Sequence, residues 1–404
     1  MELSDTIILL ILLGCMATYI PVFMCLFFTA VLGFLFFTDL PLLLLFQSIF
    51  RSMDNFALVV VLFFILCGNI MTAGSIVEKL IKMANALVSW LPGGLGMAGV
   101  LACGLFGAIS GSTVATVVAL GGFMIPALLD NGYPEKYTLG LMTTSPNLGV
   151  IIPPSIGMIL YSMISNVSLE GLFLTGFIPG MLIMFLTCLY SYLFFRNKKE
   201  IVRMPIIFSG VFTANEAAVV ACVYAFIVEL LIHKSMKFSQ VKQITVNSAV
   251  TSATLLIIVA GATCFGRLLT LEDIPGRITE TVLSAITSPA IFLLAMNALL
   301  LVVGMFMDII SATMILGPVF LPMLDAFDIN WMHFGLIMTV NLAIGYCTPP
   351  MGVSLYITGA IANRDLVYVS KAVMPFIVIQ ILVLLLMTFF PDVVLWFPRM
   401  MGFE

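Results

Sequence analysis

Two stretches of the sequence place small polar residues beside paired prolines within apolar runs. They read SPNLGVIIPPSIG, from Ser145 to Gly157, and NLAIGYCTPPMG, from Asn341 to Gly352. A proline lacks an amide hydrogen and biases the preceding residue away from the helical region, so a helix that enters either stretch should unwind, the first over 147–154. The carbonyl oxygens freed there are hard ligands that suit Na⁺, so these stretches predict cation binding. Nearby side chains add oxygens to the set: Thr144, Ser145, Asn147, Asn341 and Thr348.

A second set of polar residues precedes each proline pair. Ser110–Thr113 interrupts the apolar run GLFGAISGSTVATVVALGGFMIP, and Asp308 and Ser311 interrupt the later run LLLVVGMFMDIISATMILGPVFLP. Each apolar arm beside the first interruption has about a dozen residues, or ~18 Å of helix, which is shorter than a bilayer core of ~30 Å. We therefore expect two re-entrant hairpins, whose tips present amide hydrogens to an anionic solute.

Asp308 is the single carboxylate in the apolar run 291–323. Acids within membrane segments often bind ions or solutes, and a carboxylate at the start of a helix also caps it. The sequence leaves both roles open for Asp308.

The elements that must position these residues lie in a membrane. The chain has 404 residues, of which 62% are hydrophobic and 9% charged, whereas soluble domains carry about 25% charged residues. We expect an all-α integral membrane protein with about ten to twelve membrane segments. The first segment follows the acidic stretch MELSDT, so we interpret it as a retained helix bent at Pro21. The clearest apolar segments are 6–37, 56–71, 139–164, 171–195, 205–232, 247–268, 334–361 and 371–397.

The composition also argues against an enzyme. Eight cysteines are scattered through apolar segments without a CxxC pair, which favours small buried side chains over disulfides or metal ligands. His233 and His333 are the only histidines, and neither a Ser/His constellation nor a pair of intramembrane carboxylates is present. We expect no organic cofactor and no nucleic-acid partner.

An internal repeat relates the two polar regions. At a spacing of 196 residues Gly149 matches Gly345 and Ser112 matches Asp308, and Asn341 falls two positions earlier than Asn147 would require. Glycine and proline carry most of the matches, and composition alone rarely reproduces their spacing. The spacing does not decide between parallel and inverted copies. The remaining matches are Gly121 with Gly317, Pro126 with Pro322, Pro153 with Pro349, and Pro154 with Pro350.

Three further segments have simpler interpretations. Glu216 stands at a predicted helix start, where it suits the positive end of the helix dipole. The charged cluster 51–56 is expected to anchor a loop. The stretch EKLIKMANALVSWLPGG predicts an amphipathic helix at the membrane interface.

Several motifs resemble the large membrane subunit of the tripartite ATP-independent periplasmic (TRAP) transporters, and they cover most of the chain. They are FILCGNIM, ANALVSWLPGGLGMAGVLACGLFGAISGSTVAT, ALGGFMIPALLDNGY, LGVIIPPSIGMILY, LFLTGFIPGML, GMFMD and FGLIMTVNLAIGYCTPPMGVSLY. The resemblance implies an inverted-repeat secondary transporter of the elevator type, with two re-entrant hairpins and two unwound helices. It implies Na⁺-driven uptake of an organic acid delivered by a periplasmic binding protein. It also implies a separate small four-helix membrane subunit and a multi-pass location in the bacterial inner membrane.

The resemblance places sodium sites and a solute site on particular residues. The solute would lie between the hairpin tips. The implied domains are 1–97 and 166–290 as scaffold, 98–165 and 291–362 as the transport part, and 363–404 as a C-terminal helix. The candidate sodium ligands are Ser110, Ser112, Ser145, Asn147, Gly149, Gly304, Asp308, Ser311, Asn341, Gly345, Thr348 and Met351. The candidate solute residues are Ser110, Gly111, Thr113, Asn147, Ser311, Asn341 and Thr348.

The chain departs from the family pattern in three places. Leu62 stands where a proline is usual, the TPTEAA-like segment begins Thr213-Ala214-Asn215-Glu216, and the link FRNKKEIVRMPIIFSGVFT is short. Two alternatives to an active carrier remain open, which are a channel or passive permease and a truncated or inactive carrier subunit.

Overall fold

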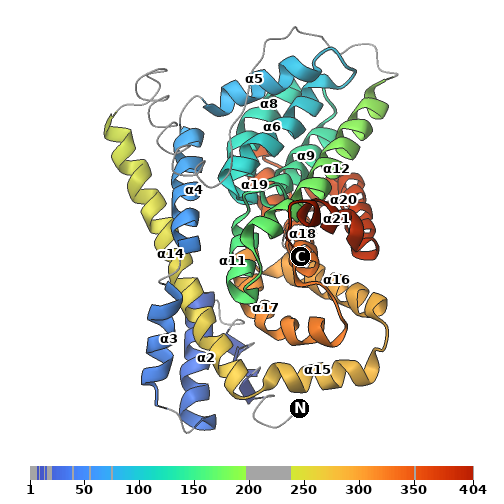
Figure 1. Cartoon of the computed structure of the whole chain (residues 1–404). Coiled ribbons are helices and arrows are strands. Elements are labelled where there is room, and N and C mark those ends of the chain that lie inside the picture. The colour runs from blue at the N-terminus through green and yellow to red at the C-terminus, as the bar shows by residue number, and fades with distance from the viewer. Residues whose placement is uncertain are drawn as a thin grey trace.

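The computed structural model describes residues 21–38, 41–53, 56–73, 76–196, 238–349 and 352–403, together with 7–8, 10–12 and 14–15. All regular elements in this part are helices (Figure 1). Seven are long and apolar enough to cross a membrane: Thr113–Asp130, Glu135–Ser165, Leu169–Phe195, Gln240–Leu271, Pro289–Phe306, Ile309–Ala326 and Leu366–Phe389. Shorter apolar helices accompany them. The predicted segment 205–232 and Glu216 lie outside the described residues.

The predicted segment 6–37 is described only in part. Helix α2 (Val22–Phe37) begins directly after Pro21, a position that suits a proline, and the bend predicted there stays a prediction because residues 16–20 lie outside the described part. The short helix α5 (Ile76–Val88) buries Ile81 and Ala84 and exposes Lys79 and Lys82, which is an amphipathic pattern, and its position at the membrane interface stays a prediction. Between α2 and α5 lie α3 (Leu43–Met53) and α4 (Phe56–Ala73).

The first hairpin turns at the predicted tip but has longer arms than predicted. Helix α6 (Gly94–Ser110) ends at Gly111, which has a φ of 61°, a left-handed conformation that glycine adopts readily. The second arm consists of α7 (Thr113–Thr116), a π-helical turn η1 (Val117–Gly121) and α8 (Gly122–Asp130). The arms have 17 and 18 residues, roughly 26 Å each, so the predicted dozen was wrong. The error arose because the arms extend further from the tip than the apolar run suggested, the first back to Gly94 and the second on to Asp130.

The first broken helix unwinds later than predicted. Helix α9 (Glu135–Thr144) tightens into a 3₁₀ turn, η2 (Ser145–Asn147), and continues as α10 (Leu148–Ile151). Only 152–155 is extended before α11 (Ile156–Ser165), so unwinding from 147 was wrong. The prolines act locally, because each proline disturbs only its own turn and the residue before it.

The second half repeats this order. A hairpin of α16 (Pro289–Phe306) and α17 (Ile309–Ala326) precedes a second broken helix, α18 (Trp331–Gly345) and α19 (Val353–Ala362). The apolar segment 371–397 is two helices and not one, because Pro391 starts a new helix. The other helices are α12 (Leu169–Phe195), α14 (Phe238–Leu271), α15 (Ile274–Ala285), α20 (Leu366–Phe389) and α21 (Pro391–Met400).

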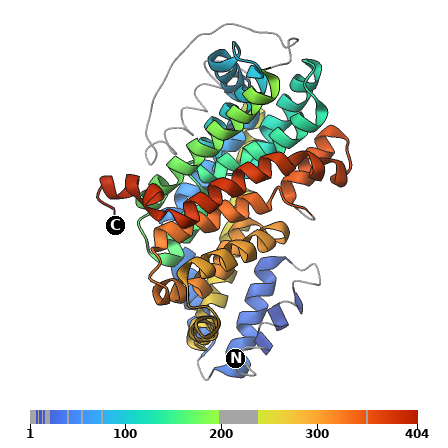
Figure 2. The same ribbon diagram turned by 90° about the vertical axis from the view of Figure 1, so that its right-hand side faces the viewer.

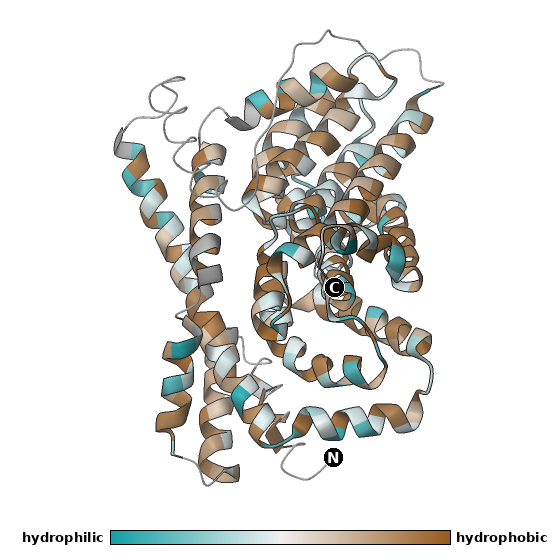
Figure 3. Ribbon diagram, in the orientation of Figure 1, coloured by the Kyte–Doolittle hydropathy of each residue, from teal (hydrophilic) through white to brown (hydrophobic). Residues whose placement is uncertain are grey.

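The two halves are arranged as an inverted repeat would be. Helix α15 follows α5 at nearly the 196-residue spacing, and the two lie at opposite ends of the molecule (Figure 1). Helices α6 and α8 lie in the upper half of that view, and α16 and α17 lie in the lower half. Most ribbons are apolar, with polar residues concentrated on α15 and at one end of α14 (Figure 3).

Glycine pairs bring each hairpin into backbone contact with its broken helix. A Cβ on Gly107 of α6 would overlap the Cα of Gly149 in α10. In the second half, a Cβ on Gly345 would overlap the backbone of Gly304. Three of these glycines are predicted sodium ligands, and their shared structural property is that only glycine permits this approach.

We predict that Gly107→Ala destabilises the protein by about 1–3 kcal/mol, because the added methyl group overpacks a backbone contact. The measurement is thermal unfolding of the purified protein in detergent. Gly122→Ala is the matched control, since a Cβ on this helical glycine meets nothing within 4 Å. A Gly107→Ala melting temperature equal to that of the control would contradict the packing described here.

Candidate functional site

Both hairpin tips contact the start of α11. The amide of Ile156 donates to the carbonyl of Gly111 at the first tip, at 3.4 Å. At the next residue, a Cβ on Gly157 would lie 2.8 Å from Cγ2 of Ile309, which follows the second tip. The predicted tips are therefore neighbours in space, although about 200 residues separate them in sequence.

The residues matched by the repeat, Ser112 and Asp308, do the same structural job. Ser112 Oγ accepts from the amide of Ala115 at 3.4 Å, and Asp308 Oδ2 accepts from the amide of Ser311 at 2.9 Å. Each side chain caps the second arm of its hairpin. Ser155 likewise caps α11, through the amide of Met158. Three helix starts, with their partial positive charge, therefore gather around the tips.

Oxygens of the first tip converge on Gly149. A Cβ at Gly149 would lie 3.0 Å from Oγ1 of Thr116 and 3.3 Å from the carbonyl oxygen of Ser112. Thr116 also bonds to that carbonyl at 2.7 Å and to Ser110 Oγ at 3.2 Å. The space left by the absent Cβ, which we call the Gly149 cradle, is bounded by these two oxygens and by the Cα of Gly107 at 3.0 Å. Its two oxygens are ligands of the type that a hard cation prefers. Ser110, Ser112 and Gly149 are brought together as predicted.

The second tip lies against the second broken helix. The hydroxyl of Tyr346 accepts a hydrogen bond from the amide of Ile309 at 3.0 Å. Gly304 contacts Gly345, and the carbonyl oxygen of Leu342 lies 3.1 Å from the Cβ position of Gly304. Thr348 donates its hydroxyl to Ile344 within its own turn, at 2.8 Å. Met351 lies outside the described residues.

Four predicted site residues carry buried side-chain oxygens that make no hydrogen bond. They are Thr113 Oγ1, Ser145 Oγ, Ser311 Oγ and Asn341 Oδ1, in residues that are at most 3% exposed. A buried polar atom without a partner costs about 1–3 kcal/mol, so a ligand that binds it regains stability. Thr29 and Thr138 share this property outside the site.

The two broken helices cross each other directly. The thiol of Cys347 lies 3.1 Å from the carbonyl of Thr143 and 3.5 Å from Oδ1 of Asn147. Thr143 also donates to Thr358 of α19, at 3.0 Å. Asn147 is thus fully buried at the crossing and not at a tip. Sequence reasoning missed Cys347 and Thr358, because a thiol and a lone threonine in apolar runs read as packing residues.

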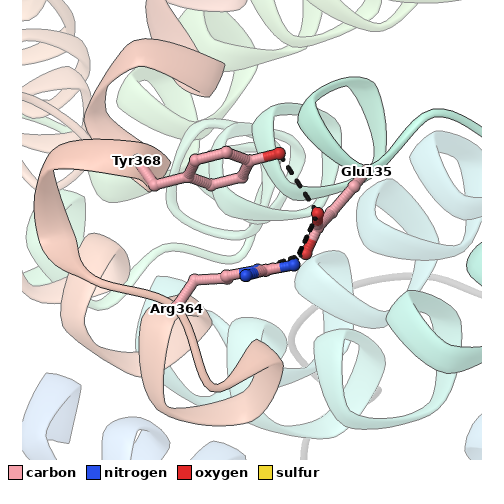
Figure 4. A network of polar contacts seen from close by, with 3 residues as sticks. All are labelled: Glu135, Arg364 and Tyr368. Atoms are coloured by element: carbon pink, nitrogen blue, oxygen red, sulfur yellow. Dashed lines mark hydrogen bonds and ion pairs between the residues drawn. The ribbon is translucent and has the colours of Figure 1, made fainter.

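An exposed ion pair joins the outer ends of the same elements (Figure 4). Arg364, in the turn before α20, bonds Glu135 at the start of α9 through two nitrogens, at 2.6 and 3.0 Å. The hydroxyl of Tyr368 donates to the same carboxylate at 3.1 Å. Hydrogen bonding to Glu135 raises the pKa of the Arg364 guanidinium above its ordinary value. Since Arg364 is half exposed, the pair orients the two helices more than it stabilises them.

The available ligands suit a hard monovalent cation. In the part of the chain that the structure describes, no group of three or more His, Cys, Asp or Glu residues could hold a metal. The tips and the crossing offer hydroxyl, carboxamide and carbonyl oxygens together with the carboxylate of Asp308, and this set of hard oxygen ligands fits Na⁺ better than a transition metal.

Comparisons with known proteins agree on one family. The family model described as "Tripartite ATP-independent periplasmic transporter, DctM component" matches residues 9–205 and 201–393. The C4-dicarboxylate TRAP transporter large permease protein DctM of Rhodobacter capsulatus is 33% identical, over 99% of this chain and all of that protein. The isethionate TRAP transporter permease protein DctMQ of Oleidesulfovibrio alaskensis is also 33% identical, over 89% of this chain and 61% of that protein.

A solved structure supports the fold alone. The Alcanivorax borkumensis YdaH transporter superposes with a TM-score of 0.67 and covers 97% of this chain and 98% of its own. Its sequence identity is 14%, so the likeness concerns the arrangement of helices.

We predict that Asp308 acts on stability as a cap and not through its charge. Asp308→Ala should lower the free energy of unfolding by about 1 kcal/mol, whereas Asp308→Asn, which can still accept the amide of Ser311, should leave it within a few tenths. Thermal unfolding in detergent measures both variants. An equal loss in both would show that the charge, and not the cap, stabilises the tip.

Proposed function

Because the chain belongs to the DctM component family of the TRAP transporters, we propose that it is the large permease subunit of a Na⁺-coupled carrier that imports a small organic acid. The observation that supports this most is the set of unpaired buried oxygens at Thr113, Ser145, Ser311 and Asn341, beside two tips that both contact the start of α11. Two of these oxygens, Thr113 Oγ1 and Ser311 Oγ, belong to the first turn of a helix that starts at a tip.

The solute class follows from charge. The relatives are named for C4-dicarboxylate and isethionate, and both solutes are anions. The starts of α7, α11 and α17 gather at the tips, where their amide hydrogens favour a carboxylate. We infer that the solute binds between the tips at Gly111, Thr113 and Ser311, with Ser110, Asn147, Asn341 and Thr348 as the further predicted contacts.

Sodium would occupy two places that the repeat relates. The first would use the cradle at Gly149 with Ser110, Ser112, Ser145 and Asn147. The second would use Asn341 and Ser311 with Gly304, Asp308, Gly345, Thr348 and Met351. Bound there, Na⁺ would give the unpaired buried oxygens a partner and so offset the free-energy cost of burying them. Its positive charge would also attract the anionic solute.

The chain's own residues would do the rest. The glycine contacts hold each tip against its broken helix, so the oxygens of both elements keep a fixed relation to one another. We propose that this transport part, 98–165 with 291–362, moves as a body relative to the scaffold, which is an elevator-type motion.

The partners and location follow from the family. We propose that a periplasmic binding protein delivers the solute and that a small four-helix membrane subunit completes the carrier in the bacterial inner membrane. The Rhodobacter capsulatus alignment runs over 440 positions, more than the 404 residues of this chain, so this chain lacks residues that the relative has. Uptake by the assembled carrier decides between an active subunit and an inactive one.

We predict that Asn341→Ala raises the sodium concentration for half-maximal uptake at least about tenfold, because it removes an unpaired buried oxygen. Uptake is measured in proteoliposomes with the small subunit, the binding protein and an imposed sodium gradient. Asn131→Ala is the matched control, since Asn131 also donates to the carbonyl four residues earlier but is exposed.

Asn147→Ala should act in the same direction as Asn341→Ala. Uptake that persists when choline replaces sodium would contradict coupling to Na⁺. Flux without a gradient or binding protein would instead identify a channel or passive permease.

A further inference from the structure

Helix α20 lies outside both hairpins and both broken helices, yet hydrogen bonds connect it to both broken helices, to the first directly and to the second through α16. It runs beside helices of the first half (Figure 2) and carries two buried polar residues, Gln380 and Thr388, each 2% exposed. Gln380 forms hydrogen bonds with Thr144 and Asn147 of the first broken helix, ahead of its break. Thr388 reaches Asn341 of the second broken helix through Asn297 of α16. A buried amide in a membrane helix needs such partners.

The direction of the first hydrogen-bond chain is fixed by a backbone carbonyl. The carbonyl of Thr144 can only accept, so Gln380 must turn its amino group toward it, at 3.0 Å. Gln380 Oε1 then faces Asn147 and accepts from its Nδ2, at 2.9 Å. Asn147 therefore turns Oδ1 toward Cys347. The Cys347 thiol has one hydrogen to share between the carbonyl of Thr143 and Oδ1 of Asn147, so this Oδ1 can still bind a cation.

The second chain is fixed in the same way. The hydroxyl of Thr388 donates to the carbonyl of Leu384 at 2.8 Å, so toward Asn297 its oxygen can only accept. Asn297 donates to it at 2.9 Å and turns Oδ1 toward Asn341.

Two acceptors fix the orientation of the Asn341 carboxamide. Its amino group donates one hydrogen to Asn297 Oδ1 at 2.7 Å and the other to the carbonyl of Ile337 at 2.9 Å. Its own Oδ1 is then the buried acceptor without a partner.

We propose that Gln380 and Thr388 are positioning residues through which α20 holds the Asn147 and Asn341 carboxamides with their oxygens ready to accept a cation. This inference rests on the proposed function. A carboxamide that loses one of its fixed partners can turn over more easily and present amino hydrogens to the cation in place of its oxygen. Fixing the carboxamide before binding removes that ordering cost, and α20 becomes part of the ion sites although its side chains contact no ion.

Thr388→Val tests the second chain, because it removes the hydroxyl and keeps the shape. In the proteoliposome uptake assay, the sodium concentration for half-maximal uptake should rise about tenfold, while the solute KM at saturating sodium stays within about twofold. Thr388→Ser, which keeps the hydroxyl, should restore the wild-type sodium dependence. A purely structural defect would lower the maximal rate or the amount of folded protein without moving this concentration.

The control is Thr279→Val on α15. Thr279 is buried and donates to the carbonyl four residues earlier, as Thr388 does. Gln380→Met tests the first hydrogen-bond chain with a side chain of similar length. It also tests the positioning role if Thr388→Val does not fold. It should also raise the half-maximal sodium concentration about tenfold.

The outcomes separate the two proposals. The positioning role alone would be overturned if wild-type uptake depends on sodium but the half-maximal sodium concentrations of Thr388→Val and Gln380→Met both equal that of Thr279→Val. Wild-type uptake that ignores sodium would overturn the proposed function and this inference together.

Discussion

The structure is organised by the cost of polar groups inside an apolar environment. A helix that breaks within the membrane exposes backbone groups that lipid cannot satisfy, each at a cost of several kcal/mol, so a break persists only where protein or a bound ligand completes it. Here each broken helix packs against a hairpin, against the other broken helix and against α20. Most of the polar groups are satisfied by these neighbours, and a few oxygens near the tips are left over. Those remaining oxygens are what the chain has to offer to an ion.

Close backbone packing makes this enclosure possible. Glycine at Gly107, Gly149, Gly304 and Gly345 lets a hairpin touch a broken helix without side chains between them. The same glycine contacts place the tips and the helix starts beside them near the point where the two broken helices cross. An arrangement that gathers helix starts and unpaired oxygens in one place can bind an anion and a cation together, which is what coupled transport of an organic acid requires.

The parts of this arrangement that depend on local backbone chemistry could be predicted from the sequence. Gly111, Ser112 and Asp308 marked the tips, and the proline pairs marked the breaks, because glycine, proline and capping residues act on their own turn. The arm lengths and the start of unwinding were wrong, since helix ends far from a glycine or proline depend on packing, and a proline disturbs only its own turn and the residue before it. Gln380, Asn297 and Thr388 could not be predicted, because their partners lie 44 to 236 residues away and their types are common in helices. The division into scaffold and transport parts stays a prediction.

The most direct measurement is a pair of cryo-EM maps of the assembled carrier in lipid nanodiscs, one in sodium chloride and one in choline chloride. We expect difference density in sodium at the Gly149 cradle and beside Oδ1 of Asn341, with both broken helices unchanged in course. Two maps without a difference at either place would contradict the claim that these oxygens are left unpaired for an ion.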